Sequence, residues 1–223
     1  MATKPNPSLA NPRGYFITLE GGDGAGKSTQ AAILAAWISS EYGREVVRTY
    51  EPGDSKLGQQ LRHLIQHGDD MDERTEALLF AADRAHHVAT VIRPALARGA
   101  VVICDRYIDS SVAYQGAGRA LHPQQVADLS KWATAGLQPD VTILFDIAPE
   151  QAVARLTGTK DRIEGAGLEF QRRVRAGYSE LVTANPSRWL VIPATGSINT
   201  VAGLAQAALK PRLDGLFGQS PVS

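Results

Sequence analysis

One stretch of the sequence has the residue types and spacing to hold a chain of phosphates: residues 20–30, which read EGGDGAGKSTQ. Gly21, Gly26, Lys27 and Ser28 fit the pattern GxxxxGK(S/T), after an apolar run and before an alanine-rich stretch. Glycines let successive backbone N–H groups point at one anion, and the following helix adds the positive end of its dipole. We therefore predict a nucleoside triphosphate site, in which Lys27 reaches the transferred phosphate and the Ser28 hydroxyl binds Mg2+. The predicted phosphate-binding residues are Gly21, Gly22, Asp23, Gly24, Ala25, Gly26, Lys27, Ser28 and Thr29.

A magnesium ion at such a site needs a carboxylate, usually one at the end of a neighbouring core strand. Asp105 ends the apolar run AVVICD and Asp146 ends the run VTILFD, so both are candidates. Either carboxylate could instead serve only to end its strand. We favour Asp105 as the metal ligand because the residues that follow it are the more unusual.

The stretch CDRYIDSSVAYQGAGR, residues 104–119, indicates what receives the phosphate. Arg106 should project into the crevice of the phosphate loop, where a guanidinium can bind a phosphate of the donor or of the acceptor through paired hydrogen bonds. Ser111, Tyr114 and Gln115 follow as a cluster of hydrogen-bonding side chains. A hydrolase needs one group that positions water, whereas this cluster suits the recognition of a second substrate.

Short apolar runs rich in valine and isoleucine alternate with longer helical stretches along the chain. The runs predict strands buried on both faces at 15–20, 45–50, 100–105, 141–146 and 188–193. The stretches between them predict helices at 27–43, 56–68, 73–99, 124–136 and 149–156. This alternation predicts a doubly wound α/β fold with about five parallel strands, right-handed crossovers and helices on both faces. Ligands collect beyond the carboxyl ends of such strands, where the phosphate loop, Glu51, Asp105 and Asp146 fall.

Composition and charge restrict the functions open to the chain. Its 223 residues suit one α/β domain, and 23 lysines and arginines balance 23 aspartates and glutamates. Without a basic excess we expect no nucleic acid and no anionic membrane as partner. No apolar run is long enough to cross a bilayer, residues 1–13 resemble neither signal peptide nor anchor, and the single Cys104 suits a reducing compartment. We predict a cytoplasmic protein with a disordered tail at 1–13 and one domain at 14–215.

Several motifs occur together, in an order that resembles the thymidylate kinase family over about residues 15–180. They are the phosphate loop GGDGAGKST, TYEPGDS at 49–55, LLFAADR at 78–84, DRYIDSSVAYQG at 105–116 and DRIE at 161–164. The resemblance implies a P-loop NTPase-like fold with a helical lid, and direct in-line transfer of a phosphoryl group from ATP to dTMP, giving dTDP. It also implies Mg2+ as cofactor and a homodimer.

The resemblance assigns roles around the acceptor's sugar and phosphate. Asp23 would accept a hydrogen bond from the 3′-hydroxyl of the sugar, and Tyr114 would crowd the 2′ position and so favour deoxyribose. Arg62 and Arg106 would clamp the 5′-phosphate. Glu51 is placed with them among the acceptor-binding residues.

The resemblance also assigns the residues that would recognise the base. Phe80 would stack on thymine and Arg84 would hydrogen-bond it; the two are four residues apart and share one face of the predicted helix. Ser111 and Gln115 would read the edge of the pyrimidine. From periodicity alone, Phe80 would be assigned to the core instead.

Residues 149–180 are rich in charge and have glycines at their centre, which by default indicates a solvated pair of helices. In the family the same features form a lid that closes over the γ-phosphate and excludes water. The phosphate loop of this chain lacks an arginine, so the chain resembles the bacterial type, in which the lid supplies the catalytic cation. We predict Arg162 or Arg155 in that role, with Lys160 in reserve.

Two residues depart from the family pattern. Tyr50 stands where an arginine is common, and Asp54 stands where a second glycine is common. Losing a cation here should weaken the grip on the acceptor phosphate, or shift it to Arg62 and Arg106. The sequence offers no physical reason for Asp54.

The long helix predicted at 73–98 has two further features. His86 and His87 are neighbours that point about 100° apart, so we interpret them as surface or packing residues rather than metal ligands. Its apolar residues that could serve a dimer interface or the core equally well are Leu78, Leu79, Val88 and Val91.

Two other functions are open at this point. A kinase for another nucleoside monophosphate or for a deoxynucleoside is one, although the combination of Phe80, Arg84, Tyr114 and Gln115 argues against it. A P-loop switch that hydrolyses its nucleotide slowly is the other. Guanine-binding switches usually carry an NKxD motif, and the sequence has none.

Overall fold

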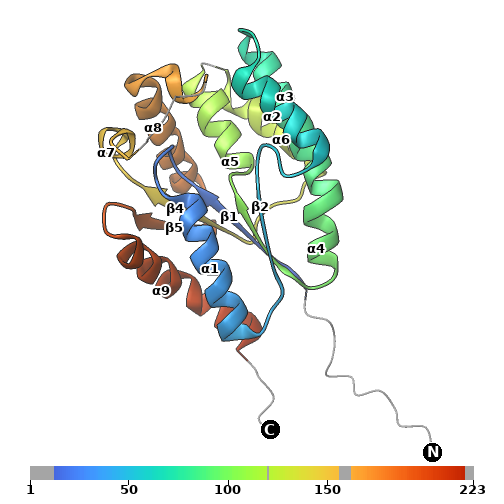
Figure 1. Cartoon of the computed structure of the whole chain (residues 1–223), viewed down its shortest axis with the longest axis vertical. Coiled ribbons are helices and arrows are strands. Elements are labelled where there is room, and N and C mark those ends of the chain that lie inside the picture. The colour runs from blue at the N-terminus through green and yellow to red at the C-terminus, as the bar shows by residue number, and fades with distance from the viewer. Residues whose placement is uncertain (1–12, 120, 156–161, 219–223) are drawn as a thin grey trace, which may run out of the picture.

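The five predicted strands are confirmed and form one parallel sheet at the centre of the molecule (Figure 1). In the computed structural model, which describes residues 13–119, 121–155 and 162–218, they are β1 (Tyr15–Glu20), β2 (Val46–Tyr50), β3 (Val101–Asp105), β4 (Val141–Asp146) and β5 (Trp189–Pro193). Their order across the sheet is β2-β3-β1-β4-β5, and all neighbours are parallel. Because β1 and β3 pair with Leu19 opposite Asp105, the phosphate loop and Asp105 leave the sheet side by side.

Helices connect these strands as predicted, with additions. The α-helices of the described residues are α1 (Lys27–Tyr42), α2 (Lys56–His67), α3 (Glu73–His87), α4 (Arg93–Ala97), α5 (Ile108–Ser111), α6 (Pro123–Ala133), α7 (Pro149–Val153), α8 (Leu168–Ala184) and α9 (Ile198–Phe217). Two π-helical segments, η1 (Val88–Ile92) and η2 (Val112–Gly118), and two 3-10 turns, η3 (Glu164–Ala166) and η4 (Pro186–Arg188), complete them. None of the helices in the described ranges is long and apolar enough to span a membrane.

Local sequence explains where several helices begin and end. α1 lies between Gly26, with φ 89°, and Gly43, with φ 61°, both in the left-handed region that glycine adopts at least cost. The side chains of Ser55 and Asp72 accept hydrogen bonds from backbone N–H groups in the first turns of α2 and α3. The long helix predicted at 73–99 is α3, η1 and α4 in succession, with Pro94 in the first turn of α4, where its missing N–H costs little.

The sheet is buried on both faces, because alternate side chains of each strand point to opposite sides. α1 and α9 cover one face, over Ile17, Leu19 and Phe145. η1 and α4 cover part of the other face, over Phe16 and Val102, and α8 covers the part near β4 and β5. Figure 1 shows α1 and α9 apart from the layer of α3, α4 and α8.

The C-terminal helix α9 was not among the predicted helices, although a signal for it exists. Val201, Ala205, Leu209 and Leu213 recur at every fourth position and are all buried against the sheet. Pro211 and several glycines interrupt the pattern at the level of the sequence. The predicted tail at 1–13 lies outside the described residues except for Arg13, which is exposed and pairs with Asp140 at 2.8 Å.

We expect Leu209→Ala to destabilise the fold by about 2–5 kcal/mol, because the side chain is fully buried between α9 and the sheet. Urea unfolding would measure this free energy. Leu204→Ala on the exposed side of α9, where the side chain is 45% exposed, is the matched control and should change it by less than about 0.5 kcal/mol. Equal losses in the two variants would contradict the position assigned to α9.

Candidate active site

The phosphate loop follows β1 and is shaped by glycine. Gly24 has φ 81°, and a Cβ there would lie 2.3 Å from the backbone oxygen of Ala152 in α7. Only glycine allows α7 to approach the loop this closely. The loop then enters α1, whose N-terminal end is left without a side-chain cap at Gly26. Its first N–H groups can therefore bind an anion.

Lys27 is buried at the start of α1 and is held by the loop itself. Its Nζ donates to the backbone oxygens of Gly21 at 3.0 Å and Gly22 at 2.9 Å. Burial, together with the neighbouring Arg106 charge, lowers the pKa of Lys27 to about 8. An anion bound beside it would stabilise the protonated form.

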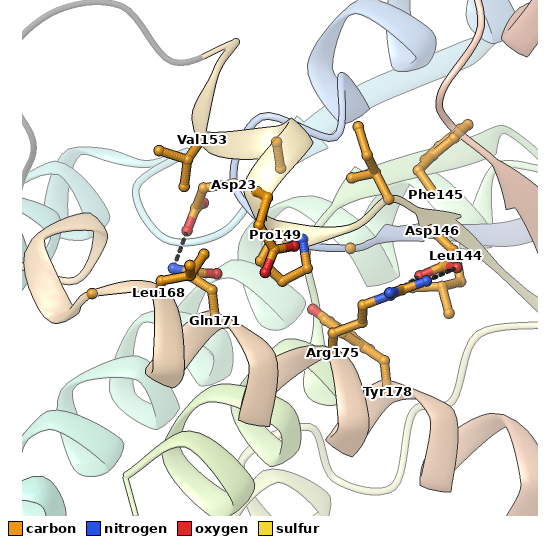
Figure 2. Close-up of a pocket in the computed structure, with 16 residues that line it drawn as sticks. Asp23, Leu144, Phe145, Asp146, Pro149, Val153, Leu168, Gln171, Arg175 and Tyr178 are labelled. Atoms are coloured by element: carbon orange, nitrogen blue, oxygen red, sulfur yellow. Dashed lines mark hydrogen bonds and ion pairs between the residues drawn. The ribbon is translucent and has the colours of Figure 1, made fainter.

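Ser28 and Asp105 meet as the sequence predicts. The Ser28 hydroxyl donates to Asp105 Oδ2 at 2.5 Å, and Asp105 Oδ1 is buried without a hydrogen-bond partner in the described part of the chain. Oxygen ligands of this kind suit Mg2+. The competing Asp146 is bound instead by Arg175 through two hydrogen bonds of 2.7 and 2.8 Å (Figure 2).

Arg106 occupies the centre of the crevice. Its backbone φ of 70° is in the left-handed region, which is uncommon for a residue with a side chain. The guanidinium pairs with Asp23, donates to the Tyr114 hydroxyl at 3.1 Å and to the Gly21 oxygen at 3.2 Å. Burial alone would raise the pKa of Asp23, but the Arg106 and Lys27 charges outweigh it and hold that pKa below its usual value.

Two adjoining cavities open on either side of Asp23 and Arg106. The larger, about 590 Å3, is lined by the phosphate loop, Tyr50, Arg62 and Asp105. The smaller, about 140 Å3, is a recess that shares Asp23, Glu51, Arg62 and Arg106 with it. The other predicted acceptor residues that line this recess are Phe80, Arg84, Ser111, Tyr114 and Gln115.

The side chains of the recess differ in whether their hydrogen-bonding groups are already occupied within the protein. Phe80 is half-buried on its wall. Ser111 is 3% exposed, and its hydroxyl has no partner among the residues that the structure describes. A buried hydroxyl of this kind is costly unless something binds it, which favours a ligand in the recess. Gln115 already donates to Glu76 at 2.9 Å.

Arg84 belongs to a buried chain of polar contacts behind the recess. Its Nε donates to Glu51 at 2.7 Å, and His87 contacts the same carboxylate at 2.9 Å. Thr49 links His87 to Asp54, which gives the unexplained Asp54 a partner. His87 is therefore an interior packing residue. The thiol of Cys104 also lies near Glu51 and His87, but Arg84 already neutralises that carboxylate, so we assign no metal there.

The second departure from the family pattern, Tyr50, also has a partner. The Arg62 guanidinium lies 5.8 Å from the centroid of the Tyr50 ring and donates to the Pro52 oxygen at 2.8 Å. Tyr50 thus helps to hold Arg62 at the wall of the larger cavity.

The predicted lid cations Arg155 and Arg162 lie beside different cavities. Arg155 donates to the backbone oxygens of Ala194 and Thr195, beside a third cavity of about 520 Å3 between the phosphate loop and the loop after β5. Arg162 pairs with Glu76 at 2.7 Å, on the side of the acceptor recess. The structure brings neither to Lys27, and Lys160 lies outside the described residues.

A further cavity of about 300 Å3 lies behind the phosphate loop, between β4, α7 and α8 (Figure 2). Gln171 of α8 crosses it and donates to Asp23 at 3.5 Å. α8 therefore contacts the phosphate loop through Gln171. Apolar residues of its wall are Leu144, Phe145, Pro149, Val153 and Leu168.

Sequence reasoning missed Glu20, a fully buried acid at the end of β1. It accepts hydrogen bonds from the Tyr107 N–H at 2.9 Å, the Ser110 hydroxyl at 2.6 Å and the Tyr178 hydroxyl at 2.9 Å. Burial, with a smaller contribution from Asp109, raises its pKa to about 7. A glutamate at the end of an apolar strand was the available signal.

Glu20 predicts a pH dependence of stability. Because its pKa rises from 4.5 to about 7 on folding, the folded state keeps a proton that the unfolded chain loses in this range. The free energy of unfolding should therefore fall as pH rises from about 4.5 to 7, by on the order of 1–3 kcal/mol, and then level off. Urea unfolding at pH 5 to 8 would show this, and Glu20→Gln should abolish that part of the slope. Parallel pH profiles for the two proteins would refute it.

This sheet order, with a phosphate loop and a separate recess for a second substrate, defines a P-loop kinase of a small acceptor. The sequence model of the family described as thymidylate kinase matches residues 19–203. The chain belongs to the thymidylate kinase family.

Relatives of known sequence and structure agree. The chain is 54% identical over 209 residues to the thymidylate kinase of Leifsonia xyli subsp. xyli, covering 92% of this chain and 97% of that one. It is 47% identical over 208 residues to the thymidylate kinase of Cutibacterium acnes, with 92% and 99% covered. The crystal structure of thymidylate kinase from Ehrlichia chaffeensis is 34% identical, with a TM-score of 0.76, and covers 89% of this chain and 100% of its own.

Proposed function

We propose a division of labour among these residues for the reaction of the family, the ATP-dependent phosphorylation of dTMP to dTDP. The observation that carries the proposal is the pair of adjoining cavities that meet at Asp23 and Arg106. One holds phosphate-binding groups and the other holds base-binding groups, so a phosphoryl group can pass between two substrates at their boundary.

On the donor side, the loop N–H groups and Lys27 bind the phosphates of ATP. Ser28 and Asp105 would hold Mg2+, and the orphaned Asp105 Oδ1 supports this fit. The metal supplies positive charge against the phosphate oxygens when bound.

On the acceptor side, thymine occupies the recess against Phe80, where Ser111 and Gln115 hydrogen-bond its edge. The sugar lies at Asp23 and Tyr114. The 5′-phosphate then faces the larger cavity, between Arg62 and Arg106.

The chemical step needs little beyond position and charge. The acceptor phosphate is already an anionic nucleophile, so no general base is required. Arg106, at the boundary of both cavities, offsets the repulsion between the two anions and stabilises charge on the transferred group. Of the two predicted lid cations, Arg155 would add a second cation when the lid closes over bound ATP, because Arg162 is held by Glu76 on the side of the acceptor recess. The free thiol of Cys104 fits the reducing cytoplasm that we propose as the setting.

The test is ATP consumption by the purified protein with Mg2+ and each of dTMP, dUMP, dCMP, dGMP, UMP and thymidine, or without acceptor. We expect turnover to require dTMP and to stop when the metal is chelated. Consumption that is equal without acceptor would mean a hydrolase or a switch, and the assignment of the recess would then be wrong.

Arg106→Gln should lower kcat by roughly 100- to 1000-fold, because a buried cation that faces the transferred charge is lost. Steady-state kinetics with dTMP would measure it. Arg98→Gln is the control, since Arg98 is exposed and pairs with the exposed Glu45 at 2.8 Å. A kcat of Arg106→Gln close to that of Arg98→Gln would remove Arg106 from the mechanism.

We also propose a homodimer through the surface of α3 and α6, which pack on each other. Trp132 of α6 is 80% exposed and Leu78 of α3 is 57% exposed, whereas the candidate interface residue Val88 is buried in the core. Large exposed apolar side chains on neighbouring helices favour an interface.

Trp132→Glu should convert the dimer to a monomer, because a charge would be buried at the contact. Sedimentation velocity would show the change in mass. Leu204→Glu, on the exposed side of α9, should leave the dimer intact. A monomeric wild-type protein, or an unchanged dimer in Trp132→Glu, would exclude this surface.

A further inference from the structure

Glu76 lies in the first turn of α3, one turn before Phe80, and is 1% exposed. No role assigned above uses it. A buried carboxylate must find partners, and those of Glu76 come from two other parts of the chain. They are Gln115 within η2, Arg119 directly after it, and Arg162 just before η3.

The contacts of Glu76 are direct. Gln115 Nε2 lies 2.9 Å from its Oε1, and the guanidinium nitrogens of Arg162 and Arg119 lie 2.7 and 3.2 Å from its Oε2. Burial alone would raise the pKa of Glu76, but the Gln115 hydrogen bond and the Arg119 charge outweigh it and lower that pKa. The carboxylate is therefore anionic and can only accept hydrogen bonds.

This carboxylate determines which end of the Gln115 amide can face a ligand. An anion that only accepts must bind the –NH2 end, which leaves the carbonyl oxygen of Gln115 as the group for a base in the recess. Thymine has an N–H donor at N3, whereas cytosine has an acceptor at N3. Ser111 cannot make this distinction, because its hydroxyl can both donate and accept.

The same carboxylate also fixes the lid segment at the mouth of the recess. Besides its bond to Glu76, Arg162 donates through Nε to the Ile65 oxygen at 3.0 Å. The next residue, Ile163, lines the recess together with Ile65. One anion therefore joins the base-reading amide and the segment that closes over it.

We propose that Glu76 is a positioning residue for thymine recognition, which orients the Gln115 amide to accept from N3–H and, by holding Arg162, seats Ile163 over the base. The proposal rests on the proposed function and deepens it. Glu76 acts through Gln115 and touches no substrate itself.

Glu76→Gln tests it with almost no change of shape. A glutamine at position 76 can both donate and accept, so the Gln115 amide is free to turn. The affinity for dTMP, relative to the inhibition constant for dCMP, should fall about tenfold. The affinity for dTMP relative to dUMP should change by less than about threefold, because the two bases share the N3–H and differ only in a methyl group. The KM for ATP should also change by less than about threefold, since the donor site lies elsewhere.

A second variant and a double mutant separate orientation from structural damage. Glu76→Asp keeps a group that only accepts, so it should retain the dTMP-to-dCMP ratio even where affinity for both falls. In Gln115→Ala, a further Glu76→Gln change should leave that ratio unaltered, because the residue through which Glu76 acts is gone. Where Glu76→Gln does not fold, the ratio in Glu76→Asp decides alone. Glu73→Gln, exposed on the same turn of α3, is the matched control.

Two failures can be told apart. A wild-type protein that does not phosphorylate dTMP refutes the proposed function. A wild-type protein that does, combined with an unchanged dTMP-to-dCMP ratio in Glu76→Gln, overturns the role of Glu76 alone. An equal fall of the dTMP-to-dCMP and dTMP-to-dUMP ratios, or a loss of the ratio in Glu76→Asp, would also overturn it.

Discussion

Everything at the carboxyl edge of the sheet depends on keeping two cations, Lys27 and Arg106, close together and away from bulk water. Both donate to the same backbone oxygen, that of Gly21. Burial, and after it the repulsion between the two cations, lowers the pKa of Lys27. This repulsion is offset in the free protein by Asp23, and the phosphates of bound ATP and dTMP would offset it more fully. The site is therefore electrostatically complete only with its substrates.

Acidic residues at the ends of the strands provide negative charge near these two cations. Three strand ends bring one acid each: Glu20 at the end of β1, Glu51 after β2 and Asp105 at the end of β3. Within the described residues Glu51 is bound to Arg84, whereas Glu20 accepts from neutral donors and is fully buried, so the negative charge of Glu20 is costly. The parallel register places these groups side by side, whatever the connecting helices contain.

The sequence predicted the five strands and most helices between them because these depend on local pattern. Strand positions followed from apolar runs, and the contact of Ser28 with Asp105 followed from two strand ends at one edge. Contacts between distant residues were not predictable in this way. Charge in the lid was visible, but the pairing of Arg162 with Glu76 depends on how α3 and the lid meet in space.

The departures from the family pattern show the same limit. Tyr50 and Asp54 looked like losses when only their own positions were considered. In the structure Tyr50 lies against Arg62, and Asp54 ends a chain through Thr49 to His87. Each departure is understood only together with the side chains that it contacts in the folded chain.

The place of the single thiol has a practical consequence. Cys104 is fully buried in β3 at the centre of the sheet, and burial raises its pKa well above the usual value. It is therefore inert toward electrophiles while the sheet is intact. Covalent labelling of the Cys104 thiol would require the central strands to separate. The rate of its alkylation therefore reports how often the whole molecule opens.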